Sequence, residues 1–337
     1  MTEIDAKAKE TLVSVRRLKK YFPIGGGLLQ KAKSNVHAVD DVTLDVYAGQ
    51  TLGLVGESGC GKTTMGRLAL KLLPKTEGEI YFQGEDIYKY TKEQEKNFRT
   101  KAQLIFQDSF SSFDSRNKIG TIIGEPLEVH GVCKGTELTD RVAELLRIVG
   151  LKPELAAEYP HTLAAGQKQC IGIARSIALR PNFIVADEPI SALDVSVRAM
   201  VLNLLKDLQA SQNLTYMFIS HDIRVVRWLS SHIAVMYVGK LVEYGETEEI
   251  FAHRLHPYTE ALLCAVPIED PKDRHIKREI LLGEVPSPVD PPPGCRFAAR
   301  CKLATERCFK EDPPLLERRP GHWVSCFENF EGDSEIS

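Results

Sequence analysis

The stretch Gly56-Glu57-Ser58-Gly59-Cys60-Gly61-Lys62-Thr63, followed by Thr64, fits the phosphate-binding pattern Gly-x4-Gly-Lys-[Ser/Thr]. Glycines let backbone N–H groups curl around a phosphate, and a following helix presents its positive end to the anion. In such a loop Lys62 reaches the β- and γ-phosphates, and the Thr63 hydroxyl binds Mg²⁺. An ordinary glycine turn is disfavoured, because a short apolar strand (50–55) precedes the loop and a segment with helical spacing (65–73) follows it.

A second apolar strand, FIVADE at 183–188, ends in two acidic residues. A carboxylate in this position can hold the hydration shell of a magnesium ion, which suits Asp187. The adjacent Glu188 can polarise an attacking water as a general base. Taken alone, the pair is equally well interpreted as two solvated acids, but downstream of a phosphate loop the catalytic interpretation is favoured.

The order of expected elements indicates an α/β fold. Apolar strands at 183–187, 215–220, 233–238 and 240–245 alternate with helical segments such as 195–209, which predicts a mostly parallel sheet with helices on both faces. Near the N-terminus, alternating residues in TLVSVRRLKKYFPI (11–24) and VHAVDDVTLDV (36–46) predict an edge strand and a half-buried antiparallel strand.

Chain length and a proline-rich spacer indicate two domains. The 337 residues are enough for roughly two domains at about 150 residues each. Residues 108–180 have helical periods and few strand signals, so we expect a helical insertion there. Five prolines between positions 286 and 293 predict a stiff spacer. We therefore expect a nucleotide-binding domain at 1–255 and a small cysteine-containing domain at 256–337.

Charge and hydropathy exclude several classes of protein. Lys plus Arg number 43 and Asp plus Glu 46, a net charge of −3, so a basic face for nucleic acid is not expected. No apolar run approaches the roughly 18 residues of a spanning helix, and the N-terminus lacks an apolar signal core. The eight cysteines then indicate reduced thiols or a metal site rather than disulfides.

Together these motifs resemble the ATP-binding-cassette family of transport ATPases. Ile105-Phe106-Gln107 is similar to its Q-loop, Ser191-Ala192-Leu193-Asp194 to its D-loop, and Ser220-His221-Asp222 to its switch histidine. The chain is more specifically similar to the F-type ATPase subunit of bacterial dipeptide and oligopeptide importers, through LKKYFPI (18–24), EPISALDVSVRAMVLNLL (188–205), FISHD (218–222), HPYTEALL (256–263), GEVPSPVDPPPGC (283–295) and the C-terminal cysteines.

This resemblance implies a P-loop, RecA-like sheet with an antiparallel edge subdomain, a helical insertion and a C-terminal accessory domain. It implies that Gln107 senses the γ-phosphate and Mg²⁺, and that His221 binds the γ-phosphate and helps to hold the attacking water; a surface helix-cap histidine is the alternative. An aromatic residue would stack on adenine, with Phe22 the first choice, Tyr21 the second, and edge-strand packing the alternative. Further ATP contacts are expected from Asp194, Gly166 and Gln167.

One motif departs from the family pattern. Where the family has Leu-Ser-Gly-Gly-Gln, this chain has Leu163-Ala164-Ala165-Gly166-Gln167. Ala164 has no hydroxyl to donate to a γ-phosphate, and Ala165 adds a methyl where glycine allows close approach. Cys170 also stands where arginine is usual. The alternative is that these substitutions in the signature are tolerated without loss of function, but we favour a weakened signature.

Because these ATPases dimerise head to tail, the weak signature predicts an unlike partner, a second ATPase subunit with an intact signature. The resemblance also implies two transmembrane permease subunits, an extracytoplasmic binding protein acting indirectly, and a peripheral place on the cytoplasmic face of the cell membrane. The alternatives are a non-transport cassette protein acting on nucleic acid or ribosomes, and a regulatory subunit with little turnover. The chain has a single cassette, no heptad run and no basic face, which argues against the non-transport protein. The presence of Glu188 and His221 argues against the regulatory subunit.

Four cysteines follow the proline spacer: Cys295, Cys301, Cys308 and Cys326. Their spacing fits neither zinc-ribbon nor ferredoxin patterns, yet a small polar module gains stability from a metal. The resemblance favours a [4Fe-4S] cluster, with zinc as the alternative and four separate thiols as a third possibility. Since the phosphate loop is expected in another domain, ATP binding is expected to be largely independent of this module.

Overall fold

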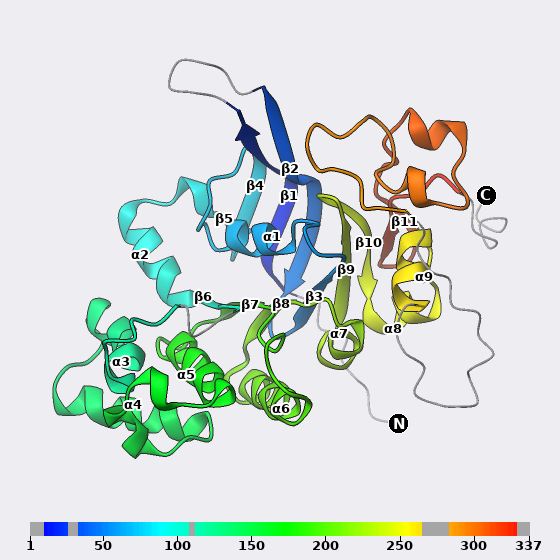
Figure 1. Cartoon of the computed structure of the whole chain (residues 1–337). Coiled ribbons are helices and arrows are strands. Elements are labelled where there is room, and N and C mark those ends of the chain that lie inside the picture. The colour runs from blue at the N-terminus through cyan, green and yellow to red at the C-terminus, as the bar shows by residue number, and fades with distance from the viewer. Residues whose placement is uncertain (1–9, 26–32, 108–111, 265–282, 329–337) are drawn as a thin grey trace, which may run out of the picture. The chain divides into compact units, whose positions relative to one another are not determined.

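The computed structural model describes residues 10–25, 33–107, 112–264 and 283–328 (Figure 1). The chain divides into two compact units, each assembled from separate stretches of sequence. Unit 1 comprises Met1–Leu12, Val46–Thr51 and Gln83–Ile219, and unit 2 comprises Val13–Asp45, Leu52–Phe82 and Ser220–Ser337.

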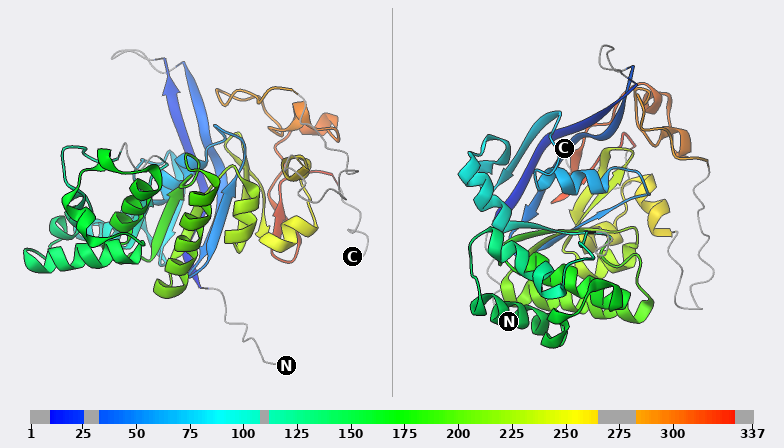
Figure 2. Two further views of the ribbon diagram at one scale, coloured as in Figure 1. Left: turned by 60° about the horizontal axis from the view of Figure 1, so that its bottom comes forward. Right: turned by 60° about the vertical axis from the view of Figure 1, so that its left-hand side comes forward.

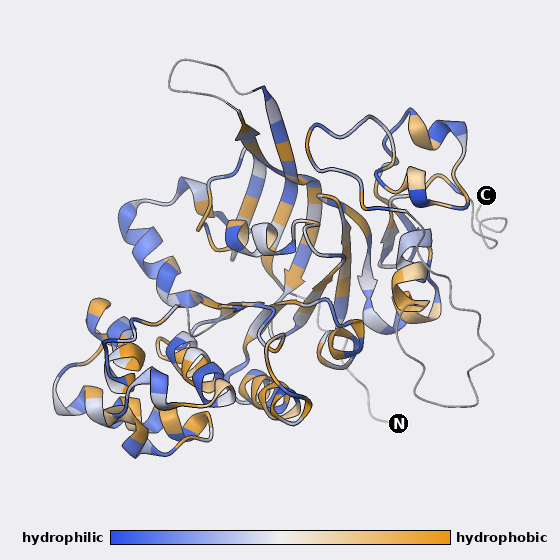
Figure 3. Cartoon of the chain, in the orientation of Figure 1, coloured by the Kyte–Doolittle hydropathy of each residue, from blue (hydrophilic) through white to orange (hydrophobic). Residues whose placement is uncertain are grey.

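Unit 1 contains three parallel strands in the order β8-β7-β6: β6 (Ala102–Ile105), β7 (Phe183–Asp187) and β8 (Thr215–Ile219). Every residue of β7 and β8 is buried. Strands covered on both faces are apolar without alternation, which is the pattern that the sequence has here (Figure 3). Asp187 therefore lies at the carboxyl end of a buried strand, and Glu188 follows it directly.

The helices of unit 1 include a group that lies within the predicted insertion; residues 108–111 of that insertion lie outside the described residues. Its members α3, α4 and α5 pack together (Figures 1 and 2). In contrast, α2 carries mostly charged side chains (Figure 3) and begins at a capping box made by Thr91 and Gln94. The bounds are α2 (Lys92–Lys101), α3 (Ile119–Val129), α4 (Thr136–Ile148), α5 (Ala165–Ile177) and α6 (Val195–Gln212), with β5 (Glu85–Asp86) and the 3₁₀ turns η1 (Ile87–Lys89), η2 (Pro153–Ala157) and η3 (Pro160–Thr162).

Unit 2 contains an antiparallel group in the order β2-β1-β4, formed by β1 (Thr11–Ile24), β2 (Ser34–Tyr47) and β4 (Glu77–Phe82). Val13 is opposite Phe82 in the β1–β4 register. The prediction that 11–24 forms an edge strand is therefore wrong. Its second neighbour, β4, comes more than fifty residues later, and local alternation carries no information about such a partner.

The second strand group of unit 2 has the order β11-β12-β10-β9-β3. Here β3 and β9 are parallel, with Val55 opposite Val235, and the other pairs are antiparallel. The two C-terminal strands, which sequence reasoning did not predict, extend this group. The bounds are β3 (Thr51–Val55), β9 (His232–Tyr237), β10 (Lys240–Glu246), β11 (Leu316–Arg319) and β12 (His322–Val324).

Among its described residues, unit 2 also has four short helices: α1 (Lys62–Ala69), α7 (Ile223–Leu229), α8 (Thr247–Ala252) and α9 (Pro257–Cys264). The segment 283–328 lies beside α9 and β10 and contributes the 3₁₀ turns η5 (Ala298–Arg300) and η6 (Glu306–Phe309) (Figures 1 and 2). Among the helices of the described residues, none has the length and apolar character to span a bilayer. Parallel strands, an antiparallel group and helices together confirm the predicted α/β class.

Candidate active site

The phosphate loop follows β3 and ends at α1, as the sequence predicts. Gly56 and Gly61 adopt φ values of +148° and +107°, and an added Cβ would lie 2.1 Å from the Met236 carbonyl oxygen and 2.0 Å from that of Ala38, respectively. Gly59 also has a positive φ, but no heavy atom of the described residues would lie within 4 Å of its Cβ. The loop is thus tightly packed at Gly56 and Gly61 and open at Gly59, where a phosphate can approach.

Lys62 is held inside this loop. Its side chain is buried, and Nζ donates to the carbonyl oxygens of Gly56 at 2.7 Å and Glu57 at 3.0 Å. The ammonium group is therefore held by carbonyl groups of the loop, where it can bind a phosphate. Cys60 is also buried, which raises the pKa of its thiol, so it serves the loop as a small neutral residue.

The switch-histidine segment belongs to the same unit as the phosphate loop. The backbone N–H of Ser220 donates to the carbonyl oxygen of Leu54 at 3.3 Å, which places this segment beside the strand that enters the loop. Asp222, rather than His221, caps α7 by accepting a hydrogen bond from the Arg224 backbone N–H. His221 is exposed, and its contact with a γ-phosphate stays a prediction.

The two candidates for adenine stacking have different surroundings. Tyr21 stacks on His37, with ring centroids 4.0 Å apart, and its hydroxyl donates to Asp40 Oδ1 at 2.5 Å. Burial and this hydrogen bond raise the pKa of Tyr21. The Phe22 ring lies under Lys20 Nζ, 4.7 Å from the centroid. One face of Tyr21 is thus covered by His37, and the choice between the two rings stays a prediction.

In unit 1 the predicted base and the Q-loop glutamine lie together. Gln107 Nε2 donates to Glu188 Oε2 at 3.1 Å. Glu188 has a φ of +45°, and its backbone N–H donates to the carbonyl oxygen of Ile219 at 3.0 Å. Such a conformation costs a non-glycine residue free energy and is found where the surrounding structure enforces it, often at functional sites. The preceding Asp187 is buried at the end of β7.

The altered signature forms the start of α5. Ala164 is the N-cap residue and has no side-chain oxygen for capping, although its backbone N–H donates to Gln167 Oε1 at 3.1 Å. Ala164 and Ala165 are both exposed. Gly166 is buried, and a Cβ there would lie 2.5 Å from Val197 Cγ1 of α6. Packing of α5 against α6 therefore explains Gly166, and its predicted contact with ATP stays a prediction.

Two other residues of these motifs have local structural roles. Asp194 caps α6 by accepting from the Val197 backbone N–H at 3.0 Å, and this bond holds the pKa of its carboxyl below the usual value. Burial of Cys170 in α5 raises the pKa of its thiol to about 11. A nucleotide contact of Asp194 stays a prediction.

The four C-terminal cysteines converge on one small cavity, which His256 and Phe297 also line. All four are free thiols, and burial raises the pKa of Cys295 to about 11. Within the described ranges, however, no three His, Cys, Asp or Glu side chains are grouped so that they could hold a metal ion. The four thiols therefore line one cavity without forming, in the part of the chain that the structure describes, a close set of ligands for one ion, and the cluster stays a prediction.

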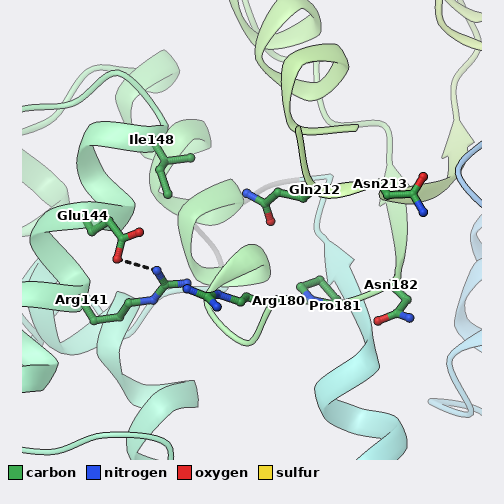
Figure 4. A pocket seen from close by; sticks show the side chains of 8 residues that line it. All are labelled: Arg141, Glu144, Ile148, Arg180, Pro181, Asn182, Gln212 and Asn213. Atoms are coloured by element: carbon green, nitrogen blue, oxygen red, sulfur yellow. Dashed lines mark hydrogen bonds and ion pairs between the residues drawn. The ribbon is translucent and has the colours of Figure 1, made fainter. Parts of the chain in front are cut away.

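Sequence reasoning missed two residues that contact the phosphate loop, Tyr258 and Arg300. Both bind Glu57: the Tyr258 hydroxyl accepts from the Glu57 backbone N–H, and the Arg300 guanidinium donates to the Glu57 carboxylate. Tyr258 lies in the HPYTEALL segment, which carried the resemblance without indicating a role. A further pocket in unit 1 contains none of the motif residues (Figure 4); it is lined by Arg141, Glu144, Ile148, Arg180, Pro181, Asn182, Gln212 and Asn213.

Comparison with known proteins identifies the family. A family model described as "ABC transporter" matches residues 39–191, and one described as "Oligopeptide/dipeptide transporter, C-terminal region" matches residues 242–308. Over 324 residues the chain is 47% identical to "Oligopeptide transport ATP-binding protein AppF" of Bacillus subtilis (strain 168), covering 95% of this chain and 98% of that relative. The chain belongs to the ABC transporter ATPase family.

Other comparisons agree with this membership. The chain is 44% identical over 323 residues to "Dipeptide transport ATP-binding protein DppF" of Haemophilus influenzae (strain ATCC 51907 / DSM 11121 / KW20 / Rd), covering 96% of this chain and 98% of that one. A solved dimeric ATP-binding cassette, MJ0796, bound to ADP and Pi is 27% identical with a TM-score of 0.63, over 70% of this chain and 99% of that one. This ABC ATPase therefore hydrolyses ATP, and Mg²⁺ is its expected metal ion.

Proposed function

We propose that this ABC ATPase energises a membrane importer of dipeptides or oligopeptides. The match of residues 242–308 to the C-terminal region of oligopeptide and dipeptide transporters is the observation that carries this proposal. The names of AppF and DppF, which are similar over nearly the whole chain, support it. The ATPase would act peripherally at the cytoplasmic face of the membrane, with two permease subunits and, indirectly, an extracytoplasmic binding protein.

For hydrolysis we assign each role to a residue of this chain. Lys62 binds the β- and γ-phosphates, Glu188 accepts the proton of the attacking water, and His221 holds the γ-phosphate. The Gln107–Glu188 hydrogen bond supports the assignment of Glu188, because it orients the carboxylate. Thr63, Asp187 and Gln107 would hold Mg²⁺, which neutralises charge on the phosphates when bound. Phe22, or alternatively Tyr21, would stack on adenine.

We further propose an unlike ATPase partner. In a head-to-tail dimer the start of α5 would face the partner's nucleotide, and Ala164 and Ala165 are exposed there without a hydroxyl. Two copies of this chain would place the weak signature at both sites. A partner with an intact signature would complete the site built on this chain's phosphate loop. The same signature is the one observation that favours the second candidate function, a regulatory subunit with little turnover.

For the C-terminal cysteines we propose a shared iron–sulfur cluster within an accessory domain at 256–337, next to a cassette at 1–255. The convergence of four free thiols on one cavity supports it. Anaerobically purified protein should be brown and contain iron and sulfide, and Cys301→Ser should lose them. Colourless protein with stoichiometric zinc would show that the four cysteines bind zinc rather than iron. Colourless protein without metal would leave four separate thiols.

One experiment tests the function most broadly. The chain is expressed with its candidate partner ATPase, permeases and binding protein, and ATP-dependent peptide uptake is measured in vesicles. Uptake that requires the intact Glu188 supports the importer. Peptide uptake that continues unchanged in Glu188→Gln, while the partner site is also disabled, contradicts it. Uptake that survives Glu188→Gln with an active partner site favours the regulatory role.

A further inference from the structure

We propose that Arg300 and Tyr258 are positioning residues that hold the phosphate loop through Glu57 and thereby raise the affinity for ATP. Glu57 is the second residue of the loop, and its side chain belongs to a variable position of the motif. Both partners come from the C-terminal segment, more than two hundred residues away in sequence. All three lie in unit 2.

Arg300 makes a bidentate ion pair with Glu57. Its Nη1 lies 2.8 Å from Oε2 and its Nη2 lies 3.2 Å from Oε1, and the arginine side chain is only 5% exposed. Nη1 also donates to the Tyr237 hydroxyl at 3.1 Å. The bond to Glu57 raises the pKa of Arg300, so the charge is permanent. A planar, doubly bonded pair fixes orientation as well as distance.

Tyr258 fixes the backbone at the same residue. Its hydroxyl oxygen accepts from the Glu57 N–H at 2.9 Å, and the side chain is fully buried. The ring packs on Tyr237 and Phe297, with centroid separations of 4.6 and 5.5 Å. The Glu57 N–H is therefore committed to the C-terminal segment and is not available to a phosphate.

Glu57 connects Arg300 and Tyr258 to Lys62. The Glu57 carbonyl accepts from Lys62 Nζ at 3.0 Å, while its carboxylate and N–H are held by Arg300 and Tyr258. Releasing Glu57 would let the loop rotate and move the carbonyl that locates the ammonium group. Binding to a preorganised loop costs less ordering free energy than binding to a loose one.

The same contacts connect the loop to the cysteine cavity. Arg300 is adjacent to Cys301, and Phe297, which packs on Tyr258, lines the cavity. ATP binding should therefore depend on the cysteine module, whereas the sequence alone led us to expect that it is largely independent. Coupling between two sites is reciprocal, so ATP on the loop should in turn order the segment around Arg300.

The direct test measures the Kd of MgATP for the full-length protein carrying Arg300→Ala, by competition with a fluorescent ATP analogue. The matched control is Arg307→Ala, an exposed arginine of the same segment that pairs with Glu311 at 2.9 Å. We expect Arg300→Ala to raise Kd by about tenfold, Arg307→Ala to leave it unchanged, and Arg300→Lys to recover part of the loss. Turnover at saturating ATP should change less than about twofold, because no group at the reacting atoms is removed.

Two further readouts separate positioning from a merely structural role. Glu57→Gln added to Arg300→Ala should raise Kd little further, since both changes break one interaction. In hydrogen exchange, MgATP should slow exchange in η5 of the wild type, slow it less in Arg300→Lys, and leave it unchanged in Arg300→Ala. An unchanged Kd in folded Arg300→Ala, additive effects of the two changes, or protection of η5 by MgATP in Arg300→Ala would each overturn the proposal.

Discussion

Replacing Lys62 with alanine tests the phosphate loop at its most buried charge. Lys62 is 5% exposed and its ammonium group donates to two loop carbonyls at 2.7 and 3.0 Å, so it is held at a fixed place when nucleotide arrives. A hydrogen bond to a charged group contributes about 1.5–3 kcal/mol. At about 1.4 kcal/mol per tenfold change, Lys62→Ala should raise the Kd of MgATP by about 10- to 150-fold.

The assay is titration calorimetry of full-length protein with MgATP, with thermal melting to confirm that the variant folds. Lys92→Ala is the control, because Lys92 is exposed at the start of α2 and is not part of a nucleotide motif. Its Kd should equal that of the wild type. A folded Lys62→Ala protein that binds MgATP within about threefold of the wild type would refute the argument that this ammonium group contacts the phosphates.

Three other perturbations test separate parts of the account. Glu188→Gln should bind MgATP and lose turnover by at least about 100-fold, since an amide cannot accept a proton from water; single-turnover hydrolysis at the wild-type rate would contradict it. Ala164→Ser with Ala165→Gly should raise the turnover of this chain alone, because a hydroxyl and close backbone approach return at both composite sites; an unchanged rate in assembled dimers would count against the weak signature. Cys170, whose burial raises its pKa to about 11, should resist alkylation at pH 8 until the protein unfolds, since the thiolate is scarce well below the pKa; modification at the rate of a free thiol would show that the α5 core is open.

Local physics made much of the site predictable from the sequence. The glycine-lysine motif of the phosphate loop and the apolar run of β7 are each written within a few consecutive residues. The phosphate loop, the acidic pair at 187–188 and the α/β class followed from such patterns. The missing hydroxyl at Ala164 was equally visible, because it is a property of one residue.

Other features depend on residues that are distant in sequence. Arg300 and Glu57 are 243 positions apart, and neither residue alone indicates an ion pair. The central place of β1 and the addition of β12 to β10 likewise depend on strand pairing, which alternation does not specify. The left-handed backbone of Glu188 is imposed by its surroundings, because its side chain has no preference for that conformation.

The most direct test of the central claim, ATP hydrolysis in the service of peptide import, is ATP turnover by the reconstituted complex with and without peptide-loaded binding protein. The complex contains this chain, its partner ATPase and the permeases in lipid vesicles. We expect loaded binding protein to stimulate turnover and Glu188→Gln in this chain to abolish the stimulation. Turnover that is the same with and without peptide-loaded binding protein, in a complex shown to be assembled, would contradict the claim.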